Sequence, residues 1–206
     1  VRGYKAIGVT DHVGVGNLEW VVKTLVKDCA EATKRWDIVA VPGVEITHVP
    51  KEDIDLVART AKELGARLVT VHGETIVEPV EPGTNEAALR SPAVDILAHP
   101  GLISYEDARL GAEMGIFLEV SARRGHSLTN GHVVRMAKLA GASLVLDSDA
   151  HQPEDLLTPE LTLSIALGAG LTSEEAHAVL QLNPQSLLAK LGVSFGPAPQ
   201  PRSVAP

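Results

Sequence analysis

The sequence contains only one cysteine, Cys29, among 206 residues. One cysteine cannot form an internal disulfide, and it cannot supply the several thiolates of a cysteine-rich zinc site. Long apolar runs are also missing: none approaches the roughly 18 residues that a membrane-spanning helix needs. No basic and then apolar leader opens the chain. These absences favour a cytoplasmic protein that has no membrane partner.

Basic and aromatic residues are scarce. The chain has 18 Lys and Arg against 26 Asp and Glu, a formal net charge of −8, and only 3% aromatic residues. An acidic surface repels the phosphate backbone, and few aromatic side chains are available to stack on bases. This composition argues against a long nucleic acid as a partner. A small phosphorylated substrate would need a local group of positive charges.

Glycine-rich phosphate-binding loops are absent as well. Residues 13–17, Val-Gly-Val-Gly-Asn, contain two glycines but lack the third glycine and the lysine of the common nucleotide-binding loops. A nucleotide-binding fold is therefore not favoured.

The composition is sufficient for one compact domain, since 45% of the residues are hydrophobic. We expect this domain to span residues 1–195. The proline-rich segment 196–206 has no apolar periodicity and is predicted to be a disordered tail. The opening residues Val1, Arg2 and Gly3 are typical of a helix end and a turn, so we expect the domain to be incomplete at its N-terminus.

Short apolar runs alternate with longer segments of helical period, a pattern typical of a parallel sheet built from βα units. The predicted strands are Ala6 to Val9, Ile38 to Val44, Arg67 to Val71, Val94 to Ala98, Phe117 to Val120 and Ser143 to Leu146. The predicted helices are Leu18 to Arg35, Lys51 to Leu64, Tyr105 to Met114, Gly131 to Leu139, Pro159 to Leu167, Ser173 to Leu180 and Pro184 to Leu191. Such units form either an open doubly wound sheet or most of a barrel.

Histidines and acids follow these strands, which favours the barrel. Polar residues at successive strand ends converge at the C-terminal mouth of a parallel barrel. The residues at these positions are Asp11, His12, Glu45, His72, His99, Glu119, Ser121, Asp147, Asp149 and His151. Imidazole and carboxylate together suit Zn, Mn or Fe, and two such cations hydrolyse phosphate esters. A single histidine after a strand is more often an ordinary loop residue, so the prediction rests on the set.

The other histidines carry less weight. His132 and His177 lie in predicted helices and are interpreted as surface or packing residues, and His48 is assigned to the loop before the next helix. His126 lies in a loop on the predicted active face, directly after Arg123, Arg124 and a glycine. The arginine pair could clamp a phosphate, although a solvated basic loop explains it equally well.

Four short motifs resemble those of the PHP (polymerase and histidinol phosphatase) family and occur in its order. They are Ile-Gly-Val-Thr-Asp-His at 7–12, Pro-Gly-Val-Glu-Ile at 42–46, Leu-Ala-His-Pro at 97–100 and Asp-Ser-Asp-Ala-His at 147–151. The resemblance implies a distorted seven-stranded TIM-like (β/α) barrel with two or three divalent metals at its mouth and a metal-bridging hydroxide as nucleophile.

The resemblance also implies a division of the ligands. Glu45, His72 and His99 would hold one metal, with Glu45 bridging to a second that Asp149 also binds. His12 and His151 would bind the third. The family's first strand carries His-x-His and a further histidine, and this sequence contains no such segment. The chain as given would therefore lack the first strand and could be inactive.

The leading expectation is a phosphomonoesterase similar to histidinol phosphatase. A nucleotide or nucleic-acid phosphodiesterase is one alternative. Another is a non-catalytic PHP-like module of a ribonucleoprotein, which would favour a basic face and degraded metal motifs. A zinc amidohydrolase would need a lysine after a middle strand, and no predicted strand end offers one.

Overall fold

The computed structural model describes residues 3–193 as a curled parallel sheet with helices around it. The predicted tail at 196–206 lies outside the described residues. The six strands are β1 (Ala6–Val13), β2 (Val39–Ile46), β3 (Leu68–His72), β4 (Ile96–Ala98), β5 (Phe117–Ser121) and β6 (Leu144–Asp147). They pair in chain order, and every pair is parallel. All six predicted strands are confirmed.

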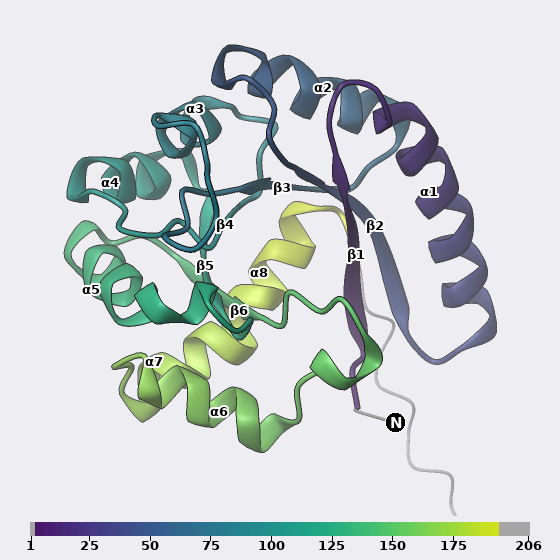
Figure 1. Cartoon of the computed structure of the whole chain (residues 1–206). Coiled ribbons are helices and arrows are strands. Elements are labelled where there is room, and N and C mark those ends of the chain that lie inside the picture. The colour runs from purple at the N-terminus through teal and green to yellow at the C-terminus, as the bar shows by residue number, and fades with distance from the viewer. Residues whose placement is uncertain (1–2, 194–206) are drawn as a thin grey trace, which may run out of the picture.

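Consecutive strand order distinguishes the two folds that the sequence left open. A doubly wound sheet reverses its strand order in the middle, whereas a barrel-type sheet runs in sequence. The order β1 to β6 therefore gives a TIM-like half-barrel (Figure 1). A seventh strand, which the resemblance implies for the complete family fold, stays a prediction.

Five helices cover the outer face of the half-barrel (Figure 1). They are α1 (Leu18–Arg35), α2 (Ile54–Leu64) with the 3-10 turn η1 (Lys51–Asp53) before it, α3 (Thr84–Arg90), α4 (Tyr105–Met114) and α5 (Asn130–Ala140). Their apolar sides and the outward side chains of the strands form the main core. Helix α3 was not predicted, because seven residues show too little periodicity to stand out from the loops around them.

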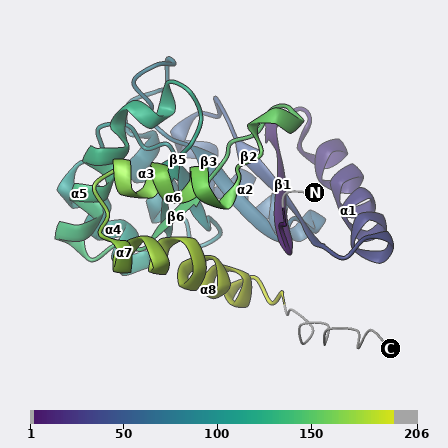
Figure 2. The same ribbon diagram turned by 90° about the horizontal axis from the view of Figure 1, so that it is seen from below.

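The C-terminal elements close the other side of the sheet. After the 3-10 turns η2 (His126–Thr129) and η3 (Pro153–Asp155) come α6 (Pro159–Gly168), α7 (Ser173–His177), the π-helical segment η4 (Ala178–Leu182) and α8 (Asn183–Lys190). Leu187 of α8 is buried with inward residues from the beginnings of the strands, including Val41 and Phe117. Figure 2 shows α8 at the end of the sheet opposite to η3. Helix α8 therefore closes the inner, N-terminal end of the half-barrel.

The half-barrel has two edges, β1 and β6. The hydroxyl of Tyr4, just before β1, connects this edge to the segment that follows β6. It donates to Leu157 O at 3.1 Å and accepts from Leu157 N at 3.0 Å. Among the described helices, none is long and apolar enough to cross a membrane.

Replacing Leu187 with alanine should lower the free energy of unfolding by about 2–3 kcal/mol, because the change leaves a cavity beneath α8. Leu139 on α5 is 65% exposed and serves as the control. Its replacement with alanine should cost less than about 0.5 kcal/mol. Urea unfolding of the two variants measures the difference, and equal losses would contradict the closing role of α8.

Candidate metal centre

The polar residues of the site follow from the alternation of side chains along the strands. Every second side chain of a strand points to the same face. Near the strand beginnings, the inward positions are apolar and pack against α8. Two or four residues later on the same face come Glu45, His72, Glu119 and Asp147. His12 of β1 is paired directly with Glu45. One face of the sheet is therefore apolar at one end and rich in ligand atoms at the other.

Several residues that the sequence predicted to follow a strand lie within one, His12 and Glu45 most clearly. Strands β1 and β2 pair over eight residues each, so His12 and Glu45 are both inside the sheet. The sequence prediction ended these strands too early, because Asp11, His12 and Glu45 are polar. His72 was also expected after its strand but is the last residue of β3, whereas His99 follows β4 directly, as expected.

The centre of the site is a contact between Glu45, His72 and His99. His72 Nδ1 lies 3.1 Å from Glu45 Oε1 and 2.8 Å from His99 Nε2, and His99 Nε2 lies 3.5 Å from Glu45 Oε1. All three side chains are buried. The structure thus brings together the three residues that the resemblance assigns to one metal.

Neighbouring groups fix the orientation of two imidazoles. His99 Nδ1 lies 2.9 Å from Glu119 Oε2, and His126 Nδ1 lies 2.7 Å from the Thr75 hydroxyl. With Nδ1 protonated in both rings, each Nε2 carries a lone pair that faces the cluster. Carboxylate or hydroxyl partners of this kind typically orient histidines that bind metals.

His126 lies deep in the site although no motif includes it. It is 4% exposed, and its ring stacks on His99 with centroids 4.1 Å apart. Its Nε2 is 3.7 Å from Asp149 Oδ2 and 3.7 Å from Glu78 Oε1. The other Glu78 oxygen is 3.2 Å from His72 Nε2, without hydrogen-bond geometry. Sequence reasoning left the role of His126 open and missed Glu78, which follows β3 by six residues.

Arg123 contacts the site, whereas Arg124 is exposed. Arg123 Nη1 donates to Asp149 O at 3.2 Å and lies 2.7 Å from His151 Nδ1. Arg123 Nε is 3.6 Å from Asp149 Oδ2. His151 is exposed at the rim, with Nδ1 3.4 Å from Asp149 Oδ1. Only one arginine of the predicted pair is therefore positioned beside the cluster.

Burial raises the pKa of three carboxyl groups in this cluster. It raises the pKa of Glu119 to about 7 and that of Asp149 to about 7, with the negative charge of Glu45 adding to both. Burial and the adjacent Glu119 raise the pKa of Asp147 well above its usual range. For Glu45, hydrogen bonding to His72 and the nearby imidazoles outweigh burial, and its pKa is lowered. The acids repel one another, and the Arg123 guanidinium beside Asp149 offsets only part of this repulsion.

These residues fit divalent cations. Two sets have ligand atoms that all lie within 4.8 Å of one another: His12, Glu45 and His72, and His99, His126 and Asp149. His72 Nε2 and Glu119 Oε1 are buried and make no hydrogen bond within the described structure. Neutral imidazole nitrogens beside carboxylate oxygens are the donors that Zn, Mn and Fe take. Both sets differ from the division that the resemblance implies: His12 takes the place of His99 beside Glu45 and His72, and His99 joins Asp149 together with His126. His151 belongs to neither set.

Backbone strain also gathers at this site. Among the described residues, three that are not glycine have positive φ: His48 (53°), His99 (27°) and Asp149 (44°). Such conformations cost energy and often occur at functional sites. The His48 ring centroid is 5.9 Å from that of His72. His48, which the sequence analysis assigned to the loop before the next helix, is therefore a neighbour of the site. Its positive φ could not be predicted from any sequence pattern.

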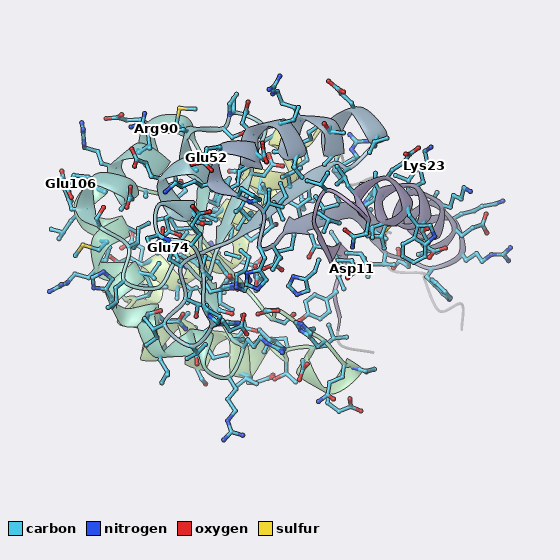
Figure 3. All side chains as sticks on the ribbon, turned by 45° about the horizontal axis from the view of Figure 1, so that its top comes forward. Asp11, Lys23, Glu52, Glu74, Arg90 and Glu106 are labelled. Carbon is cyan, nitrogen blue, oxygen red and sulfur yellow. The ribbon has the colours of Figure 1, made fainter. Side chains whose placement is uncertain are left out.

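In Figure 3, side-chain nitrogen atoms gather between the labelled side chains of Asp11, near the end of β1, and Glu74, on the loop after β3. Glu74 does not join the cluster. Its Oε1 accepts from Gly83 N and Asn85 N, both at 2.9 Å, and thereby fixes the loop over β3 to the beginning of α3. This loop carries Glu78 to the cluster.

Comparison with known proteins identifies relatives. The chain is 43% identical to the Methanocaldococcus jannaschii protein named uncharacterized protein MJ1295, over 93% of this chain and 88% of that protein. The chain belongs to the family of this archaeal protein. No family model matches the chain.

More distant relatives carry two kinds of name. The probable phosphatase Teth514_1060 of Thermoanaerobacter sp. is 29% identical over 84% of this chain and 77% of its own length. Ribonuclease P protein component 3 of Methanosarcina acetivorans is 31% identical over 56% of this chain and 54% of its own. A chain in the cryo-EM structure of archaeal ribonuclease P with mature tRNA has the same fold, with a TM-score of 0.70 and 14% identity over 97% of this chain and 91% of that one.

A metal centre at the cluster predicts a loss of bound metal when its ligands are changed. The Glu45→Gln and His126→Ala variants, loaded with Mn or Zn and dialysed, should bind at least one metal fewer than the natural chain or bind it more than about tenfold more weakly. The control is His132→Ala, since His132 Nε2 contacts the Ile103 carbonyl instead. Elemental analysis gives the metal content, and unchanged content in His126→Ala would contradict the role of His126.

Proposed function

We propose that the cluster hydrolyses phosphate esters with divalent metals, two or three of them, drawn from Zn, Mn and Fe. The observation that carries the proposal is the convergence of Glu45, His72, His99, His126 and Asp149 in one buried, acidic site. Buried acids and neutral imidazoles at such distances are costly without cations, and with cations they form a hydrolytic centre. The relatives named probable phosphatase support the phosphoesterase class.

In this proposal the residues have distinct tasks. Bound divalent cations would supply electrophilic stabilisation of the phosphate and a nucleophile near neutral pH. His12, Glu45 and His72 would hold one cation, and His99, His126 and Asp149 another. Glu119 keeps the ring of His99 oriented through its Nδ1. Arg123, half-buried beside Asp149, would contact the phosphate oxygens, and His151 would lie next to Arg123 at the rim of the site.

A second candidate function is a protein module of a ribonucleoprotein. The ribonuclease P component relatives and the match to a chain of archaeal ribonuclease P favour it as much as the phosphatase names favour the enzyme. These comparisons count against the sequence-based argument, from acidic charge and few aromatic residues, that a long nucleic acid is not a partner. The choice between the two candidate functions therefore depends on the residues of this chain.

The charge distribution favours the enzyme. The formal charge is −8, and many basic side chains on the helices already pair with acids of the same helix. Those i,i+4 pairs are Lys23–Glu19, Arg35–Glu31, Arg59–Asp55, Arg90–Glu86 and Arg109–Glu113. Phosphate backbone binding depends on Lys and Arg that neutralise phosphates. Lysine and arginine side chains that already pair with carboxylates contribute little to neutralising phosphates.

The metal-loaded chain should hydrolyse p-nitrophenyl phosphate, and Glu45→Gln should lower kcat/KM by more than about 100-fold, because Glu45 lies at the centre of the ligand set. His132→Ala should retain activity. Release of p-nitrophenol with added Mn or Zn is the measurement, and bis-p-nitrophenyl phosphate distinguishes a diesterase from a monoesterase. Full activity of Glu45→Gln would contradict a hydrolytic cluster.

The same preparation tests the second candidate. A phosphoesterase with this surface should bind tRNA no more tightly than about 10⁻⁴–10⁻⁶ M, the usual range for nonspecific binding of nucleic acid at physiological salt. Fluorescence anisotropy with labelled tRNA at two salt concentrations measures it. Binding several orders tighter, together with no hydrolysis, would favour the ribonucleoprotein module.

A further inference from the structure

A pocket opens directly beside the cluster, on the side of β2 and β3. Its volume is about 240 Å³, and its walls include Ile46, Val49, Val71 and Val80. His72 lines this pocket and also belongs to the first ligand set. A group held in the pocket is therefore adjacent to whatever the cluster holds.

Two polar residues of the pocket wall, Thr84 and Glu81, are engaged in local contacts. The Thr84 hydroxyl donates to Glu81 O at 2.7 Å, and the Glu81 carboxylate accepts from Lys51 N at 3.2 Å. The Lys51 ammonium lies 3.5 Å from Glu81 Oε1 and offsets its charge. On this wall a hydroxyl-rich occupant would gain few hydrogen bonds in place of its contacts with water. The walls consequently favour an apolar, uncharged group.

His48 also lines this pocket, and its backbone is in a strained conformation. Its φ of 53° is one that residues other than glycine seldom adopt. The imidazole lines the pocket and is tilted by 49° from the ring of His72. Two rings at this spacing can contact a flat aromatic ligand through their edges and faces.

The size of the pocket limits its occupant. Pockets for drug-sized ligands hold roughly 300–1,000 Å³, so this one suits a smaller group. A single six-membered ring fits such a space better than a base with its sugar.

We propose that the pocket binds the leaving group of the substrate, and that the preferred substrates are phosphomonoesters of small, uncharged aromatic or apolar alcohols. The inference rests on the proposed function, since it takes the cluster as the phosphate site. It assigns His48 and Val80 to substrate selection, with the phosphate on the metal side of His72.

Calorimetry with two phosphonates tests this directly and needs no turnover. Phenylphosphonate and methylphosphonate carry the same charge and differ in the group that would enter the pocket. The metal-loaded full chain should bind phenylphosphonate at least about tenfold more tightly, as expected for one apolar group in a fitted pocket. Val80→Phe, which fills the pocket, should remove that preference and leave methylphosphonate affinity within about twofold.

Ile76→Phe is the matched control, because Ile76 is 53% exposed on the same loop and does not line the pocket. It should keep the tenfold preference. Equal affinity of the natural chain for the two phosphonates would overturn the pocket assignment alone, whatever the variants do. Failure to bind either phosphonate, with metal content confirmed by elemental analysis, would overturn the proposed function and the pocket together.

Discussion

The burial of several acids among imidazoles is the interaction on which the rest of this structure depends. Glu45, Glu119, Asp147 and Asp149 lie close together at one end of the sheet, and three of them have raised pKa values because burial penalises their charge. An uncompensated charge inside a protein costs several kcal/mol, so a fold that retains such a cluster needs either protons or cations there. The strands must be rigid enough to keep these groups from moving apart into water.

The apolar half of the molecule supplies that rigidity. The inward face that ends in ligand atoms begins with Val41, Leu68, Phe117 and Val145, which pack under α8. Because both ends of the face lie on the same strands, the closing helix positions the cluster without touching it. The outward side chains of the same strands pack on α1 to α5 and hold the curvature. The apolar packing that stabilises the fold and the polar cluster of the site thus lie at opposite ends of one face of the sheet.

Much of this arrangement could be predicted from the sequence. Runs of Val, Ile and Leu mark all six strands, and the polar residue that ends or follows each run marks the site. The prediction ended β1 and β2 early, because a histidine or glutamate inside a strand looks like a loop residue until its pairing partner is known. Helix α3 was too short to recognise.

Other parts of the site depend on geometry that a sequence does not carry. His126 and Glu78 come from loops whose direction is set by tertiary contacts, such as the Glu74 carboxylate that caps α3. His48 becomes a neighbour of His72 only through a positive φ. No spacing rule links residue 48 to residue 72 or residue 78 to residue 126.

The comparisons relate this chain both to proteins named probable phosphatase and to a component of ribonuclease P, and the fold by itself does not choose between the two candidate functions. What distinguishes the candidates is whether a chain keeps a complete ligand set and what charge surrounds it. This chain keeps two sets of converging ligands, an acidic exterior and a small apolar pocket that shares His72 with one set. In the enzyme that we propose, this pocket would recognise the ester on the side of the breaking bond that lies away from the phosphate.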